Sequence, residues 1–280
     1  MLLLFGTLIC IAQGSFKTDW EKHGLKGKVK SVEDPDDTYL VRVTTYNEKG
    51  NITEIALGDE YCYANTKIVY DNKGNITEEY LDNAGGGAGT DSYKTIYVYN
   101  EKGKVIQRIG YSVLQTSQNK IDLGGKLGHG NYKESYTYDN AGRLVGREEL
   151  YINYMGGLQH SKYSYKNDDG GRAVEELVEW PSYNSSVTRN KYKYGGNKII
   201  EISTYEDDVF STKITYKYDD KGNETEKCTY DKDGNLTSKQ TSEYKFDAKG
   251  NWTERKTYNW KNGTIEGLDG IETRTIEYYD

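Results

Sequence analysis

The stretch Tyr70-Asp-Asn-Lys-Gly-Asn-Ile76 decides the fold of this chain. The Asp at its second position opens a type I turn by accepting hydrogen bonds from backbone amides further along the loop. Gly74 suits the left-handed conformation that ends such a turn, so the pattern is typical of a three-residue hairpin loop. This loop sets Asp71 opposite Asn75. The next pair outward is then Tyr70 opposite Ile76, on one face of the sheet.

The same unit recurs along the chain, with an aromatic residue at its start and a glycine four positions later. The regular units begin and turn at Tyr46 and Gly50, Tyr70 and Gly74, Tyr99 and Gly103, Tyr138 and Gly142, Tyr218 and Gly222, Tyr230 and Gly234, and Phe246 and Gly250. In most of them an apolar residue is expected opposite the aromatic one. Such cross-strand pairs stabilise a hairpin by about 0.2–1 kcal/mol each, so the repeat predicts a series of β-hairpins.

The spacing of the units predicts the topology. Turns that start at positions 46, 70, 99, 138, 165, 194, 218 and 246 are separated by 24 to 39 residues, enough for two strands and one connection between them. These turns should therefore lie at one end of an antiparallel meander. Irregular connections, together with the tight turn at Asp231, should lie at the other end. Aromatic residues two apart, such as Tyr97 and Tyr99, should project from one face.

The predicted fold class is all-β: one long antiparallel meander of repeated hairpins that forms a single domain over residues 15–280. A sheet of more than about ten strands rarely stays flat and open. We therefore expect it to curl, to spiral or to close on itself.

Composition supports a folded chain and excludes several classes of protein. The 280 residues include 28 Tyr, 31 Gly and only 2 Pro, and 29% are charged. The mean hydropathy of −0.90 is low, but an aromatic content of 13% is far above that of disordered chains. The net charge of −7, with no basic run, argues against a nucleic-acid partner.

Residues 1–14 resemble the apolar core and cleavage region of a secretory signal peptide, with cleavage predicted after Gly14. The protein is then exported, to the periplasm, the cell surface or the medium, and its mature chain has no integral membrane segment. Cys62 and Cys228 would remain after cleavage. A disulfide between them and two unpaired thiols both fit the sequence.

The Tyr-Asp-x-x-Gly-Asn/Arg-aliphatic unit resembles the YD (RHS) repeat of bacterial and teneurin-type cell-surface proteins, over most of the chain from Tyr46 onward. The stretches Leu25–Glu33, Gly250–Glu254 and Glu277–Asp280 are similar to exported Gram-negative bacterial proteins built from such repeats. This resemblance implies an architecture, while its implication for function is weak. Long RHS proteins form a hollow shell around a toxin domain, but this chain has no recognisable autoproteolytic core motif, so such a shell is not expected.

No catalytic, cofactor or metal motif stands out. His23, His129 and His160 are isolated, and no Walker loop or nucleophile elbow occurs. The stretch that starts at Asp231 has a calcium-like spacing, but the hairpin turn already explains each of its residues. We therefore predict no cofactor and no metal. Acidic residues are abundant on the face expected to be exposed, and a catalytic pair among them remains an alternative.

The favoured function is a non-enzymatic binding or scaffold protein, with a carbohydrate or a cell-surface protein as its partner. Loops on a rigid scaffold commonly carry recognition, and Tyr and Trp rings suit sugars and peptides. The candidate surface, at the end with irregular connections, comprises Trp180, Tyr183, Trp260, His129 and His160. One alternative is a hydrolase of extracellular polymers that uses loop carboxylates. Another is a component associated with an RHS-type toxin.

Overall fold

The computed structural model describes residues 18–35, 41–58, 62–85, 93–112, 121–122, 129–130, 132–152, 157–181, 186–261 and 263–280. Apart from one helical turn, α1 (Asp19–Lys22), the regular elements of these residues are antiparallel strands. The predicted all-β meander is therefore confirmed. The predicted signal peptide lies outside the described residues.

The first half of the sheet contains β1 (Val29–Pro35), β2 (Val41–Tyr46), β3 (Ile52–Gly58), β4 (Cys62–Tyr70), β5 (Ile76–Gly85), β6 (Tyr93–Tyr99), β7 (Val105–Ser112), β10 (Tyr132–Tyr138) and β11 (Leu144–Ile152). The second half contains β12 (Leu158–Asn167), β13 (Ala173–Glu179), β14 (Val187–Gly195), β15 (Lys198–Glu206), β16 (Val209–Tyr218), β17 (Glu224–Tyr230), β18 (Leu236–Phe246), β19 (Trp252–Lys261), β20 (Thr264–Thr273) and β21 (Thr275–Tyr278). A separate two-stranded sheet is formed by β8 (Ile121–Asp122) and β9 (His129–Gly130).

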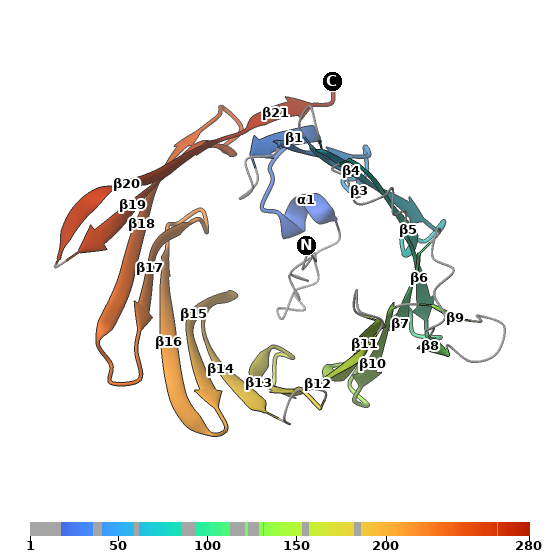
Figure 1. Cartoon of the computed structure of the whole chain (residues 1–280). Coiled ribbons are helices and arrows are strands. Elements are labelled where there is room, and N and C mark those ends of the chain that lie inside the picture. Colours follow the sequence, from blue (N-terminus) through green and yellow to red (C-terminus); the bar gives the residue numbers. More distant parts are fainter. Residues whose placement is uncertain are drawn as a thin grey trace.

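The main sheet has 19 strands and curls into a nearly closed, barrel-shaped ring (Figure 1). From β1 to β7 and from β10 to β20 each strand pairs with the next along the chain, and β7 pairs with β10 across the β8–β9 hairpin. The last strand, β21, pairs with the first, β1. Helix α1 lies inside the ring. Closing a long sheet in this way leaves few exposed strand edges, which explains why the meander does not remain open.

The predicted hairpin loops have the predicted geometry. In the loop after β4, the Asp71 amide donates to the Asn75 carbonyl at 2.8 Å, the Gly74 amide donates to Asp71, and Gly74 has φ of +84°. Tyr70 lies opposite Ile76. The same register joins Tyr46 to Ile52, Tyr99 to Val105, Tyr138 to Leu144, Tyr230 to Leu236 and Phe246 to Trp252.

One feature of these hairpins is absent from the sequence prediction. Beyond each aromatic pair the register shifts by one residue: Tyr70 lies opposite Ile76, but Val69 lies opposite Glu78. Thr77 is thus the extra residue of a β-bulge, and its hydroxyl donates to the Val69 carbonyl at 3.2 Å. A bulge increases the local twist of a sheet. It is repeated at the hairpins with uniform turns, so it favours closure of the ring.

The aromatic residue of each unit points into the ring, with one exception. Tyr46 contacts α1, which lies inside the ring, so the face of the sheet that carries Tyr46 is the inner one. Directly opposite residues share a face, so the cross-strand register shows which residues of the following hairpins point inward. Tyr230 points outward, because its neighbour Thr229 lies opposite the inward-facing Ile214. The reason is its position: the Tyr230 turn lies at the opposite end of the meander. A repeat unit alone therefore does not determine which face its aromatic residue occupies.

The largest apolar core lies where the two ends of the chain meet. Leu25, Val29, Val32, Tyr46 and Ile52 form it, with exposed fractions of 8% or less, and Trp20 and Ile276 pack against it. This cluster joins α1 to β1, β2, β3 and β21. Burial of apolar side chains therefore stabilises the closure of the ring as well as the first hairpin.

Candidate functional site

The hydroxyls of the inward-facing repeat tyrosines hold neighbouring hairpins together. The Tyr46 hydroxyl bonds His23, and five others donate to the backbone carbonyl of a residue just after the preceding turn. The pairs are Tyr70 to Ile52 at 2.6 Å, Tyr99 to Ile76 at 2.7 Å, Tyr138 to Val105 at 2.9 Å, Tyr194 to Ala173 at 2.7 Å and Tyr218 to Ile199 at 2.9 Å. The backbone pairing between neighbouring hairpins begins beyond these carbonyls: β5 pairs with β6 from Glu78, opposite Ile96, so Ile76 has no backbone donor from β6. The tyrosine hydroxyl supplies that donor.

The rings of the later repeats are covered by cations from the preceding turn. Arg172 lies over Tyr194, Lys198 over Tyr218, Lys221 over Phe246 and Lys249 over Tyr278, with 3.3 to 5.4 Å between the charged group and the ring centroid. In Tyr194 and Tyr218 the cation covers the ring, and the hydroxyl bonds a backbone carbonyl, so both the ring and the hydroxyl have a partner. The repeat aromatics thus form a structural band at the end of the ring that carries the uniform turns.

A second group of inward-facing side chains lies in the middle of the strands, from β6 to β12. We call it the inner-wall cluster, and it comprises Tyr97, Arg108, Glu134, Tyr136, Arg147, Glu149, Tyr163 and Tyr165. Cross-strand pairs connect Arg108 with Glu134, and Glu134 with Glu149. Since directly opposite residues share a face, these side chains line the interior together.

Glu134 is the centre of the inner-wall cluster. Its side chain is completely buried and accepts from Arg108 Nη1 at 2.7 Å, from Arg147 Nη1 at 3.1 Å and from the Tyr136 hydroxyl at 2.5 Å. Two guanidinium groups on one carboxylate satisfy its charge, as buried ions require. Arg147 also stacks on Tyr163, with 3.8 Å from Cζ to the ring centroid.

Two further carboxylates flank this centre. Burial raises the pKa of Glu149, although Arg147 opposes the shift, and the Tyr163 hydroxyl donates to Glu149 at 3.2 Å. On β13, the buried Glu176 accepts from the Tyr192 hydroxyl at 2.8 Å and from Asn190 Nδ2 at 3.1 Å. The buried carboxylates Glu134 and Glu176 are thus engaged by several side-chain donors.

Two buried donors of the inner-wall cluster have no hydrogen-bond partner among the described residues: Nε of Arg108 and Nε of Arg147. The Tyr165 hydroxyl lies beside the Glu176 carboxylate. The Arg147 side chain is 7% exposed and Tyr165 is 6% exposed. Buried donors in folded proteins are nearly always satisfied by protein, water or a bound group. This part of the wall therefore has hydrogen-bonding capacity that the described protein groups do not use.

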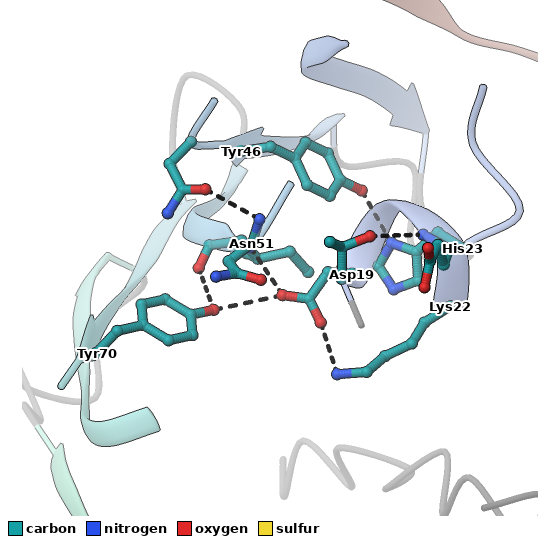
Figure 2. Close-up of polar contacts among 10 residues, drawn as sticks. Asp19, Lys22, His23, Tyr46, Asn51 and Tyr70 are labelled. Atoms are coloured by element: carbon teal, nitrogen blue, oxygen red, sulfur yellow. Dashed lines mark hydrogen bonds and ion pairs between the residues drawn. The ribbon is translucent and has the colours of Figure 1, made fainter. Parts of the chain in front are cut away.

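A separate polar cluster joins α1 to the first two hairpins (Figure 2). The buried Asp19 accepts from the Ile52 amide at 2.8 Å, from Lys22 Nζ at 2.7 Å and from the Tyr70 hydroxyl at 3.3 Å. Tyr46 shares a 2.8 Å hydrogen bond with His23 Nδ1. Burial and the nearby Asp19 raise the pKa of the Tyr46 hydroxyl, which stays protonated. The cluster anchors the segment that enters the ring.

The outer face differs sharply from the inner wall. Lysines and glutamates alternate across neighbouring strands, as where Glu226 pairs with Lys217 at 2.6 Å and with Lys239 at 2.8 Å. Similar pairs join Lys94 to Glu78 and Lys193 to Glu201. The outer face is therefore a charged surface, and mixed aromatic and polar side chains gather on the inner one.

Of the residues selected from the sequence as a binding surface, the structure describes the side chains of three, and Trp260 lies apart from His160 and Trp180. His160 lies on the outer face of β12 and bonds Glu148 at 2.7 Å, and Trp180 follows the neighbouring β13. Trp260 lies on β19, with β14 to β18 between, where its indole donates to Thr241 at 2.8 Å. His129 belongs to β9, and Tyr183 lies outside the described residues. The inner-wall cluster was not predicted, although the alternation of Tyr132, Glu134 and Tyr136 on one face was a signal for it.

The calcium-like stretch at Asp231 serves as a turn. Asp231 Oδ1 accepts from the amides of Asp233 and Asn235 at 2.9 and 2.8 Å. Within the described ranges, no three His, Cys, Asp or Glu side chains are grouped to hold a metal. Cys228 is buried with a free thiol. In the same part of the chain, no helix has the length and apolar character needed to cross a membrane.

The sequence matches no protein-family model and no curated protein. Solved structures that align with this chain include a porin-like protein from Bacteroides uniformis, at 11% identity and a TM-score of 0.46, with 90% of this chain and 98% of that chain covered. A porin-like protein from Bacteroides vulgatus aligns at 14% identity and a TM-score of 0.31, with the same coverage. The Tc holotoxin pore of Photorhabdus luminescens aligns at 10% identity and a TM-score of 0.36, over 88% of this chain and 14% of that chain. At these identities and TM-scores the alignments carry no argument about this chain.

Proposed function

We propose that this is an exported, non-enzymatic binding protein that holds a carbohydrate on its inner wall. The observation that carries the proposal is the pair of wall arginines, Arg108 and Arg147, which lie over the rings of Tyr97 and Tyr163 and whose Nε atoms donate to no described protein group. Sugars are rich in acceptor oxygens, and they commonly combine such hydrogen bonds with contacts to aromatic rings. Tyr97 and Tyr163 supply rings beside the same donors.

Export rests on the signal-peptide-like residues 1–14, and the YD-like repeat supports a role at the cell surface. Binding is favoured over hydrolysis by the state of the carboxylates. Glu134 and Glu149 lie opposite each other, but the Glu134 side chain is fully buried between two arginines. A glycoside hydrolase needs two carboxyl groups that reach the substrate. The inner wall therefore does not offer the two accessible carboxyl groups of a hydrolase, and the loop carboxylates of that alternative are a separate set.

A matched pair of variants tests the proposal. Arg108→Lys keeps a positive charge beside Glu134 but removes the unpartnered Nε donor, so the variant should bind its glycan about tenfold more weakly, a difference of about 1.4 kcal/mol. Tyr192→Phe removes a hydroxyl that donates to Glu176, so it should lower stability and leave glycan affinity nearly unchanged. Binding would be found on an array of neutral and acidic glycans and measured by calorimetry. An empty array, or binding to peptides and not to glycans, would contradict the carbohydrate assignment.

A further inference from the structure

One edge of β20 is not paired with any strand of the described chain. Its other edge pairs with β19, from Lys261 opposite Thr264 to Glu254 opposite Thr273. After Arg274 the chain continues as β21, which pairs with β1 between Val29 and Glu33. The ring is thus sealed at the end with the uniform turns and open along β20 toward the other end. An open edge presents backbone donors and acceptors that can pair with another strand.

Three apolar side chains line the outer face of this edge strand. Ile265, Leu268 and Ile271 are 53%, 52% and 51% exposed. They lie opposite Trp260, Tyr258 and Lys256, which alternate along β19 and so share one face. The outward-facing residues of β19 are two positions apart, whereas their partners on β20 are three apart, because the β19–β20 pairing contains two register shifts. The bulges therefore align all three apolar residues on one side.

The acidic side chains of β20 already have partners within the sheet. Glu266 pairs with Lys261 at 3.2 Å, Asp269 accepts from Asn259 at 2.6 Å, and Glu272 accepts from Arg255 Nε at 3.0 Å. The strand contains no Lys, Arg or Pro, the residues that often protect an edge. A Cβ placed on Gly267 or Gly270 would meet nothing within 4 Å, so the inner side of the strand is also unobstructed.

We propose that a second copy of this chain pairs antiparallel with the free edge of β20, on a two-fold axis at Leu268. Ile265 and Ile271 stand three residues to either side of Leu268. The axis therefore sets Leu268 opposite Leu268 of the partner subunit, and Ile265 opposite Ile271 of the partner subunit. Such an isologous contact is self-complementary. Because the carboxylates are paired within each copy, the contact brings together no uncompensated charge.

Analytical ultracentrifugation over a range of concentrations tests this pairing. The native chain should show a concentration-dependent dimer, and Leu268→Lys should sediment as a monomer with unchanged circular dichroism. Val209→Lys is the matched control, because Val209 is 68% exposed on β16, away from the edge, and this variant should remain dimeric. A monomeric native chain, a dimer that Leu268→Lys does not dissociate, or a larger assembly would overturn the proposal.

Cross-linking tests the register. In a background with Cys10, Cys62 and Cys228 replaced by Ser, a chain carrying Ile265→Cys is mixed with one carrying Ile271→Cys under mild oxidation. The mixture should give a disulfide-linked dimer, because directly opposite residues come within reach of a disulfide. Either chain alone should remain largely uncross-linked. Equal cross-linking of each chain with itself would contradict the axis at Leu268.

Discussion

The Tyr99 hydroxyl donates to the backbone carbonyl of Ile76 at 2.7 Å, and this contact joins one hairpin of the ring to the next. The same contact recurs between most hairpins. Phe246 has no hydroxyl, and there the hydroxyl of Tyr244, two residues earlier, donates to the backbone carbonyl of Glu224 instead. A phenylalanine or leucine would bury a similar apolar area but could not satisfy the carbonyl. This explains why the chain uses tyrosine where many proteins use other large apolar residues.

Removing one of these hydroxyls should lower stability. Tyr99→Phe leaves the Ile76 carbonyl without its donor, so we expect the free energy of unfolding to fall by about 1–2 kcal/mol in urea titrations. Tyr230→Phe is the control: Tyr230 occupies the same motif position but points outward, and its hydroxyl has no hydrogen bond among the described residues. Tyr230→Phe should therefore leave the free energy of unfolding nearly unchanged. Equal effects of the two changes would refute the structural role of the inward hydroxyls.

Docking of α1 depends on a glycine turn. A Cβ on Gly50 would lie 2.5 Å from Trp20 Cε3, whereas a Cβ on Gly74 would meet nothing within 4 Å. Both residues have positive φ, so either change to Ala costs about 1–2 kcal/mol of backbone strain. Only Gly50→Ala should also displace α1. Hydrogen exchange should then speed up at the amides of Trp20 and Leu25 in Gly50→Ala and stay slow in Gly74→Ala.

Asn251 closes the ring between the two ends of the chain. It is 2% exposed, accepts from the Lys26 amide at 2.8 Å and donates to the Lys26 carbonyl at 2.8 Å. Asn251→Ala should cost about 2–3 kcal/mol, because both backbone groups lose their partner. Asn235, at the same motif position, is exposed and bonds only within its own turn. Asn235→Ala should cost well under half as much in thermal and urea unfolding, and comparable losses would contradict the closure role.

Two glutamates, Glu149 and Glu226, should make stability depend on pH in opposite directions. Burial raises the pKa of Glu149 above its ordinary value of 4.5, so its charge destabilises the fold above the raised pKa, and the penalty is absent below 4.5. Hydrogen bonds from Lys217 and Lys239 hold the pKa of Glu226 below 4.5. The stabilisation by Glu226 is present above 4.5 and is lost as the pH falls through the lowered pKa.

Substitution by glutamine separates these two contributions. Glu149→Gln should raise stability at about pH 7 and Glu226→Gln should lower it, and both differences should shrink at about pH 3, where the unfolded carboxyl groups are protonated. Urea unfolding at the two pH values measures the effect. A gain from Glu149→Gln that persists unchanged at acidic pH would show that the charge is not its cause.

Much of the candidate site could not be predicted from the sequence. The inner-wall cluster depends on Arg108, Glu134 and Arg147, which come from three strands and are up to 39 residues apart. Alternation placed Tyr132, Glu134 and Tyr136 on one face, but a glutamate between tyrosines does not show whether a carboxylate is solvated or buried. Only the register of β7, β10 and β11 brings the two arginines to Glu134.

The sequence by itself determined the hairpins, their register at the aromatic pair and the separation of uniform turns from irregular connections. These features depend on contacts within about seven residues, as between Asp71 and Asn75, so local turn chemistry specifies them. The tertiary structure alone decided the bulges, the outward face of Tyr230 and the sealing of the ring. Sealing joins Asn251 to Lys26, 225 residues away. Such a contact forms only when the combined twist of all the hairpins has brought the two ends of the sheet together. No local sequence pattern specifies this combined twist.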